Sequence, residues 1–126
     1  MNKPFVISLE KVEDARGVLS FADKSSDLPF KIERVYWLTQ VPDQQVRGDH
    51  AHKTSRQVII CISGKILISL KSQQGQIEEF TLDDPSQGLY IPPLWWGKMV
   101  FHNATMVGLA SDPFDESDYI RRKEGF

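Results

Sequence analysis

The sequence predicts an all-β protein, built as a sandwich or as a small closed barrel. Short runs rich in β-branched and aromatic residues follow one another, and turn-type sequences such as Ser63-Gly64 and Asp83-Asp84-Pro85 separate them. The predicted strands are Phe5–Leu9, Val18–Ala22, Ile32–Thr39, Gln57–Lys65, Ile66–Lys71, Glu78–Leu82, Gly88–Ile91, Lys98–His102 and Met106–Ala110. Their even spacing, without a helical periodicity of comparable strength, favours a sandwich or barrel over alternating strands and helices.

Length and charge indicate one domain, residues 1–126, that binds neither nucleic acid nor a membrane. A chain of 126 residues is too short for two separate cores. Its 15 Lys and Arg against 17 Asp and Glu give a net charge of −2, so no basic field surrounds it. Any phosphate group that it binds must therefore be held by a few placed arginines. The polar tail from Asp115 to Phe126 is expected to hold at most one helical turn.

The single cysteine and the start of the chain indicate a cytoplasmic protein. Cys61 is the only cysteine, which excludes an internal disulfide and fits a reducing compartment. The first residues, Met1 to Phe5, lack the apolar core of a signal peptide. No apolar run reaches the ~18 residues of a membrane span.

Two of the three histidines are placed to act together. They lie in the run Arg47-Gly48-Asp49-His50-Ala51-His52-Lys53. Residues two apart on a strand point to the same face of the sheet, so His50 and His52 are expected to face one space. The alternative is that both are exposed residues at a strand end.

The histidine pair and a later segment resemble the two motifs of the cupin superfamily, which implies a cupin-type jelly-roll barrel. Gln57 and Gly64 follow the pair, and the second segment is Gly88–Gly97, with its Pro-Pro step. In cupins a histidine pair, a glutamate and a histidine of the second motif normally surround a metal. Here Gln57 takes the place of the glutamate and Gly97 that of the last histidine, so we expect no metal and no other cofactor.

Without a metal, two histidines in one pocket suit proton transfer, because imidazole titrates near neutral pH. This chemistry favours enolisation next to a carbonyl, with a positioned donor holding the enediolate. The third histidine, His102, follows Gly97 by five residues and is expected to face the other way on a regular strand.

Further runs carry a more specific resemblance. They are Asp14-Ala15-Arg16-Gly17, Glu33-Arg34-Val35-Tyr36-Trp37, the histidine run with Gln57, Gly88-Leu89-Tyr90-Ile91-Pro92-Pro93 with Trp96, Leu109-Ala110-Ser111-Asp112 and Asp118-Tyr119-Ile120-Arg121. Through them nearly the whole chain is similar to the nucleotide-sugar 3,4-ketoisomerases of dTDP-4-keto-6-deoxyhexoses, the WxcM-like cupins. The resemblance implies a metal-free homodimer that converts a dTDP-linked 4-keto sugar into its 3-keto isomer, on the way to amino sugars of bacterial surface polysaccharides.

The resemblance also implies roles for individual residues. His50 would be the base that takes the proton from sugar C3 and returns it at C4. Tyr36 would pass a proton between the two oxygens, and His52 would sit beside them. Arg16 and Arg47 would hold pyrophosphate or sugar oxygens, which suit a planar guanidinium. The other candidates for substrate contact are Gln57, Lys53, Trp96 and Gly97.

Several of these residues have a plainer explanation. Tyr36 could be an ordinary strand aromatic, Arg16 could be solvated beside its turn, and Trp96 could be a packing residue. Gln57 could contact substrate or could hydrogen-bond a histidine and fix its tautomer.

Two departures from the family leave details open. Gly97 stands where members often have histidine or arginine, and Pro113-Phe114 stands where many have a tyrosine. We expect a roomier pocket beside Gly97. The sequence leaves open whether the new C4 hydroxyl is axial (galacto) or equatorial (gluco). The presence of Arg16 without a histidine at position 97 favours galacto.

Two other functions also stay open. One is a 3,5-epimerase of the same pathway, which uses a histidine in a cupin-like barrel; its His/Asp arrangement is not found in this sequence. The other is a non-catalytic sugar-binding cupin, in which Gly97 marks lost catalysis.

Overall fold

A computed structural model describes residues 2–23 and 28–126, and almost all of their regular structure is β-strand, as predicted. The strands are β1 (Phe5–Ser8), β2 (Glu10–Asp14), β3 (Gly17–Phe21), β4 (Arg34–Leu38), β5 (Val46–His52), β6 (Gln57–Ser72), β7 (Ile77–Leu82), β8 (Gln87–Ile91), β9 (Trp95–Ala110) and β10 (Tyr119–Ile120). A short 3₁₀ turn, η1 (Glu116–Asp118), lies in the tail, where one helical turn was expected. In this described part of the chain no helix is long and apolar enough to cross a membrane.

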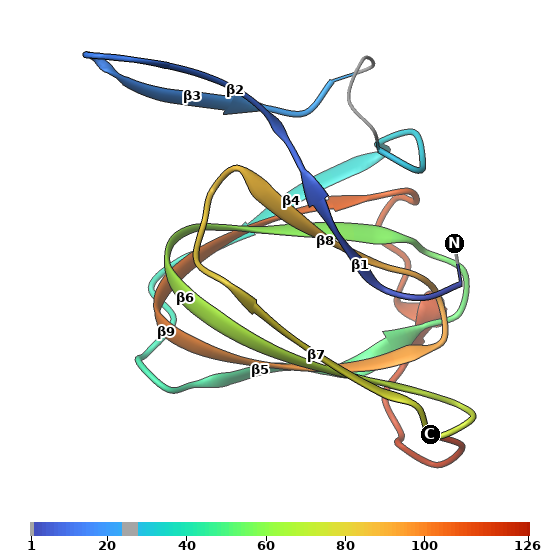
Figure 1. Ribbon diagram of the computed structural model, residues 1–126. Coiled ribbons are helices and arrows are strands. Elements are labelled where there is room, and N and C mark those ends of the chain that lie inside the picture. Colours follow the sequence, from blue (N-terminus) through green and yellow to red (C-terminus); the bar gives the residue numbers. More distant parts are fainter. Residues whose placement is uncertain (1, 24–27) are drawn as a thin grey trace.

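Two long strands, β6 and β9, form the spine of the fold. They pair antiparallel along their whole length, from Gln57 opposite Ala110 to Ser72 opposite Trp95, and both curve through the molecule (Figure 1). The sequence predicted β9 as two strands, Lys98–His102 and Met106–Ala110. It also predicted β6 as two strands, Gln57–Lys65 and Ile66–Lys71, with a turn at Ser63-Gly64. The structure shows a bulge there instead: Gly64 has φ of +76° and the register shifts, so the strand bends without reversing.

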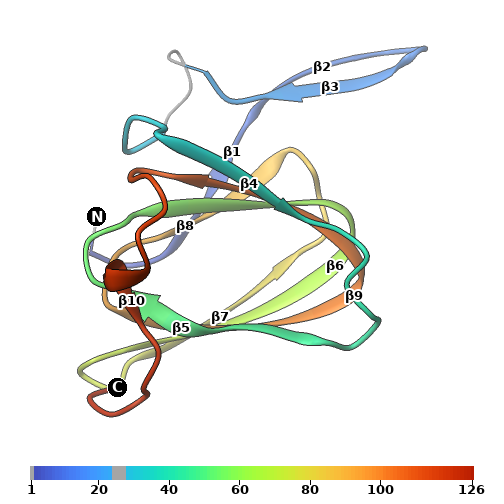
Figure 2. The same ribbon diagram turned by 180° about the vertical axis from the view of Figure 1, so that it is seen from behind.

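The other strands extend this pair into a barrel. The sheet order is β1-β8-β6-β9-β5-β10, with β4 added to β9 and β7 to β6. Figure 2, seen from behind, shows the strands curving around a common interior, with β4 on one wall and β5 on the opposite one. Strand β9 therefore carries both β4 and β5, at its C-terminal and N-terminal ends respectively.

Alternation along β6 separates the core from the surface. Ile66, Ile68 and Leu70 are fully or almost fully buried, whereas Leu67 between them is 39% exposed. This is the period of two that a strand with one covered face shows. Cys61, on the same strand, is also buried in the core, as its apolar surroundings predicted.

Strands β2 and β3 form a separate hairpin that stands away from the barrel in both views (Figures 1 and 2). Only β3 was predicted, because the run Glu10–Asp14 is dominated by charged residues. The apolar side chains of the hairpin, Val12, Val18 and Leu19, are each more than half exposed. A two-stranded hairpin is marginally stable by itself in water, so this one needs a further surface to pack on.

The bulge at Gly64 gives a test of the fold. A Cβ at this position would overlap the backbone carbonyls of His102 and Asn103. We expect Gly64→Ala to lower the free energy of unfolding by about 2–5 kcal/mol, the left-handed backbone penalty plus overpacking. The control is Gly75→Ala, because Gly75 has φ of +86° with open space around it; its expected loss is about 1–2 kcal/mol. Equal losses in urea unfolding would show that the bulge is not tightly constrained.

Candidate active site

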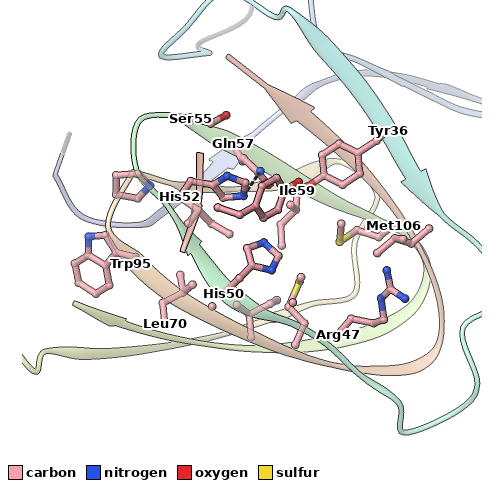
Figure 3. Close-up of a pocket in the computed structure, with 18 of the residues that line it drawn as sticks. Tyr36, Arg47, His50, His52, Ser55, Gln57, Ile59, Leu70, Trp95 and Met106 are labelled. Atoms are coloured by element: carbon pink, nitrogen blue, oxygen red, sulfur yellow. Dashed lines mark hydrogen bonds between the residues drawn. The ribbon is translucent and has the colours of Figure 1, made fainter. Parts of the chain in front are cut away.

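The barrel holds a cavity of about 520 Å³, bounded by β4, β5, β6, β9 and the C-terminal segment. Its polar lining consists of Arg34, Tyr36, Arg47, His50, His52, Ser55, Gln57, Tyr119 and Arg121. Figure 3 shows His50 in the middle of the labelled side chains, with Trp95 and Arg47 at opposite ends. The cavity therefore combines groups that can transfer protons with cationic groups that can bind an anion.

Strand β5 presents both histidines of the pair to this cavity, so the expectation that they face one space is met. The chain reaches His50 through a bulge in which Gly48 and Asp49 have φ of +80° and +62°. A Cβ at Gly48 would lie 3.1 Å from the carbonyl oxygen of Gly97, so a glycine allows the two strands to approach. Beyond the bulge the ring centroids of His50 and His52 are 5.1 Å apart, edge to face.

A chain of hydrogen bonds joins Tyr36 to His52 through Gln57. The Tyr36 hydroxyl donates to Gln57 Oε1 at 2.6 Å. Gln57 Nε2 lies 2.9 Å from His52 Nε2, and His52 Nδ1 lies 3.0 Å from Asp118 Oδ2. Gln57 is 7% exposed and His52 8%, so these bonds are largely shielded from water. Of the two roles open to Gln57, the bond to a histidine is present, and the same side chain also lines the cavity.

Asp118 was not predicted as a site residue, although it belongs to a run that carried the family resemblance. Its Oδ1 accepts hydrogen bonds of 2.8 Å from the backbone N–H and from the hydroxyl of Thr54. The Ser55 N–H donates to its Oδ2 at 3.3 Å. These bonds place the carboxylate against His52. This histidine–carboxylate contact could not be foreseen from local spacing, because the two residues are 66 positions apart.

The surroundings of the cavity set the charge states of its acids and bases. Burial lowers the pKa of His50, and the neighbouring His52 lowers it further. Burial also lowers the pKa of His52, although the hydrogen bond to Asp118 acts against it. Burial raises the pKa of the Tyr36 phenol, a shift that Arg34 opposes. At neutral pH His50 is therefore a neutral imidazole that can accept a proton, and Tyr36 is a phenol that can donate one.

Three arginines face the cavity, and two of them lie on aromatic rings. The Arg34 guanidinium is 5.2 Å from the Tyr36 ring centroid, and the Arg121 guanidinium is 4.5 Å from that of Tyr119. Arg47, from β5, is exposed. No Asp or Glu is present among the described residues that line the cavity. Sequence reasoning had named only Arg47 of these three as a candidate.

Three predicted binding residues lie outside this cavity. Arg16 is at the tip of the β2–β3 hairpin, where its Nη2 pairs with Asp14 Oδ2 at 2.7 Å. Lys53 is exposed and borders a separate, more open pocket next to η1. Trp96 is 5% exposed, and its indole N–H donates to Asp49 Oδ1 at 3.0 Å, as a packing residue would. None of the three is therefore among the residues that line the cavity of their own chain.

The remaining predicted positions behave as follows. Gly97 lines the cavity, and a Cβ there would lie 3.1 Å from Leu70 Cδ2. Trp95, not Trp96, is the tryptophan of this segment that faces the cavity. His102 lies outside it, with Nδ1 3.7 Å from Asp43 Oδ1, as expected from its strand position.

In the described part of the chain, no three His, Cys, Asp or Glu side chains are grouped as metal ligands would be.

A small barrel with a histidine pair, a phenol and arginines around one cavity defines a cupin-type protein with a site for proton transfer. The chain matches the family described as FdtA, WxcM-like, C-terminal, over residues 2–126, and it belongs to that family. It is 39% identical over 123 residues to the TDP-4-oxo-6-deoxy-alpha-D-glucose-3,4-oxoisomerase of Aneurinibacillus thermoaerophilus. The aligned residues make up 96% of this chain and 88% of that protein.

Solved structures agree with this assignment. The sugar 3,4-ketoisomerase QdtA of Thermoanaerobacterium thermosaccharolyticum, crystallised with TDP, superposes with a TM-score of 0.88 at 38% identity, covering 96% of this chain and 89% of that one. The TDP-quinovose 3,4-ketoisomerase WlaRB of Campylobacter jejuni has a TM-score of 0.88 at 34% identity, covering 97% and 95%. The predicted family and the predicted cupin-type barrel are therefore confirmed.

The contact between Tyr36 and β9 gives a test of the site geometry. Gly108 lies opposite Tyr36 in the β4–β9 ladder, and a Cβ there would overlap the phenol ring. We expect Gly108→Ala to push the phenol away from Gln57 and to cost about 1–3 kcal/mol of stability, as overpacking does. The control is Gly88→Ala, whose Cβ would meet Val58 Cγ1 at 2.6 Å, in the core. Crystal structures of both variants decide the matter, and an unmoved Tyr36 in Gly108→Ala would contradict the account.

Proposed function

We propose that this chain is a 3,4-ketoisomerase that acts on a TDP-linked 4-keto-6-deoxyhexose. The observation that carries the proposal is the pairing of a neutral base, His50, with a protonated phenol, Tyr36, in one arginine-lined cavity. The enzyme of Aneurinibacillus thermoaerophilus and the solved relatives bear names of this activity. Isomerisation between neighbouring carbons needs one base for carbon and one proton carrier for oxygen.

In the proposed reaction His50 takes the proton from sugar C3, and the electron pair of the broken C–H bond forms the C3–C4 double bond. The C4 carbonyl oxygen becomes a hydroxyl with the proton of Tyr36. The enediol then collapses in the other direction: the C3 hydroxyl gives its proton to Tyr36 and becomes a carbonyl, and protonated His50 returns a proton to C4. The starting states of His50 and Tyr36 are restored, so no redox partner is required.

The rest of the cavity supports a nucleotide-linked substrate and a reaction without a metal. Arg34, Arg47 and Arg121 can bind a pyrophosphate through charge-assisted hydrogen bonds, and no lining carboxylate in the described residues would repel it. Both ring nitrogens of His52 are occupied, one by Gln57 and one by Asp118. Neither is free to bind a metal ion in this arrangement.

We also propose that the protein is a homodimer in which the β2–β3 hairpin packs on the partner. Val12, Val18 and Leu19 of the hairpin are 55–64% exposed, and on β4 Val35 is 51% and Trp37 65% exposed. An isolated hairpin with an apolar face is not stable in water, and a second copy offers the same apolar residues in return. Such packing would also carry Arg16 toward the partner's cavity, which would reconcile its position with the role implied by the family resemblance.

The assigned roles predict how two variants behave. Incubation with dTDP-4-keto-6-deoxyglucose in the presence of a chelator should give the 3-keto isomer, identified by NMR of the product. His50→Asn and Tyr36→Phe should each lower kcat by ~10²–10⁴-fold, the usual contribution of a general acid or base. His102→Asn, outside the cavity, is the control and should keep full activity. A wild-type rate in His50→Asn would show that another group is the base.

The dimer proposal predicts complementation between two inactive variants. If Arg16 serves the partner's cavity, Arg16→Ala and His50→Asn are each weakly active, but a mixed dimer has one intact site. Co-expression in equal amounts should then restore about one quarter of wild-type activity, because half of the dimers are mixed. Absence of restoration would place Arg16 in its own chain's site, and full activity of Arg16→Ala alone would remove it from binding.

A further inference from the structure

The Gln57 side chain lies between the phenol of Tyr36 and the imidazole of His52, and it bonds them with opposite ends. Its Oε1 accepts from the Tyr36 hydroxyl at 2.6 Å, and its Nε2 donates to His52 Nε2 at 2.9 Å. An amide has one acceptor end and one donor end, so it cannot accept from both neighbours (Figure 3).

Asp118 determines which nitrogen of His52 carries the hydrogen. An ionised carboxylate only accepts hydrogen bonds, and its oxygen lies 3.0 Å from His52 Nδ1. Bonds from Thr54 hold this carboxylate in place, and they lower its pKa although burial acts to raise it. Neutral His52 therefore has its hydrogen on Nδ1 and a lone pair on Nε2. That lone pair requires the amino end of Gln57, so the direction of every bond in the chain follows from Asp118.

A second proton on His52 would reverse the rest of the chain. It would go to Nε2, which would then point an N–H at the amino group of Gln57. Turning the amide over relieves this clash of donors, since Oε1 then faces His52 and the amino group faces Tyr36. The phenol oxygen now accepts from Gln57, and its own O–H is free to point into the cavity.

We propose that Gln57 couples the protonation of His52 to the direction of the Tyr36 hydroxyl, and that Gln57 and Asp118 are positioning residues of the active site. The inference rests on the proposed function, because it assigns the arrangement in which Tyr36 can donate to the C4 oxygen. The extra proton comes from solvent and stays on His52 through the cycle, so the balance of the reaction is unchanged. In this arrangement the amino group of Gln57 also stabilises the phenolate formed when Tyr36 gives up its proton.

Several charged and titratable groups face His52 and affect this step. They are His50 from β5, Arg34 and Tyr36 from β4, Asp118 from η1, Tyr119 from β10, and Arg121 after it. Asp118 favours the added proton, whereas burial and the two arginines oppose it. Of the two histidines, it is His52 whose ring contacts Asp118 in the described structure, so we infer that the first proton bound by the pair goes to His52 and leaves His50 neutral as the base.

The coupling can be tested without substrate by nitrogen NMR of labelled histidine. Neutral His52 of the wild type should have its hydrogen on Nδ1. Asp118→Ala removes the acceptor at Nδ1, so the hydrogen should move to Nε2 and the amide should turn. Gln57→Leu leaves Asp118 in place and should keep the hydrogen on Nδ1. The control is Asp84→Asn, a turn carboxylate bonded by Ser86, which should leave the His52 spectrum unchanged. A wild-type hydrogen on Nε2 would overturn the proposal.

The pH dependence of kcat is the second test. In the wild type kcat should fall as pH rises through the pKa of His52 measured by NMR, because the deprotonated ring turns the Tyr36 hydroxyl toward Gln57. The fall should be ~10-fold to 100-fold, the effect of one misdirected buried hydrogen bond. Gln57→Leu should lose this alkaline fall. Gln57→Glu should keep His52 protonated to higher pH, because its carboxylate accepts a hydrogen bond from the ring. The same carboxylate should also accept from the Tyr36 hydroxyl and keep it away from the substrate, which lowers kcat at all pH values.

The outcomes separate this proposal from the proposed function. An alkaline fall that persists in Gln57→Leu would overturn the coupling while leaving the isomerase assignment intact. Correct tautomers by NMR in a protein that does not turn over the keto sugar would overturn the function and leave the hydrogen-bond chain intact. Gln57→Glu is nearly isosteric, so the test survives if Asp118→Ala fails to fold.

Discussion

The antiparallel pairing of β6 with β9 positions everything else in this molecule. The β9 strand has Gly108 opposite Tyr36 near one end and Gly97 opposite His50 near the other. The start of β6 places Gln57 opposite Ala110, beside the strand of the phenol. The separation of Tyr36, His50 and Gln57 is therefore maintained, because β4, β5 and β6 all pair with the one strand β9. Core side chains on the inner face of β6 fix the register, since a slip of one residue would expose them.

The two histidines of the pair differ in what surrounds them. Both ring nitrogens of His52 are hydrogen-bonded, to Asp118 and Gln57, and it is almost fully buried. The His50 ring hydrogen-bonds to the Gly48 backbone instead, and His50 lies in the middle of the labelled side chains (Figure 3). This difference fits the proposed roles, in which His50 is the base that meets the sugar and His52 helps to orient the phenol. A His/Asp pair by itself does not distinguish an isomerase from an epimerase, because either reaction begins with a base that is held in place.

The sequence was sufficient for the all-β class, the shared face of the histidine pair and the proximity of Gln57, because these depend on local spacing. It failed where distant segments meet. Asp118 reaches His52 only because β10 pairs with β5, which no periodicity reveals. For Arg16 and Trp96 the single chain shows the plainer alternatives, a residue at a hairpin tip and a buried indole, and the choice between the alternatives depends on the whole fold. A turn was predicted at Gly64 because a bulge and a turn can both require a glycine in the left-handed conformation.

In the proposed reaction, one base moves a proton between two neighbouring carbons while a phenol serves the oxygens. Incubation of the enzyme and a dTDP-4-keto-6-deoxy sugar in heavy water, followed by NMR of the sugar ring, tests it most directly. We expect deuterium at C3 of the recovered substrate and at C4 of a 3-keto product, with none at C5. Deuterium at C5 with an unmoved carbonyl would identify an epimerase. An unmoved carbonyl without exchange above background would identify a binding protein, and either result would overturn the proposed isomerisation.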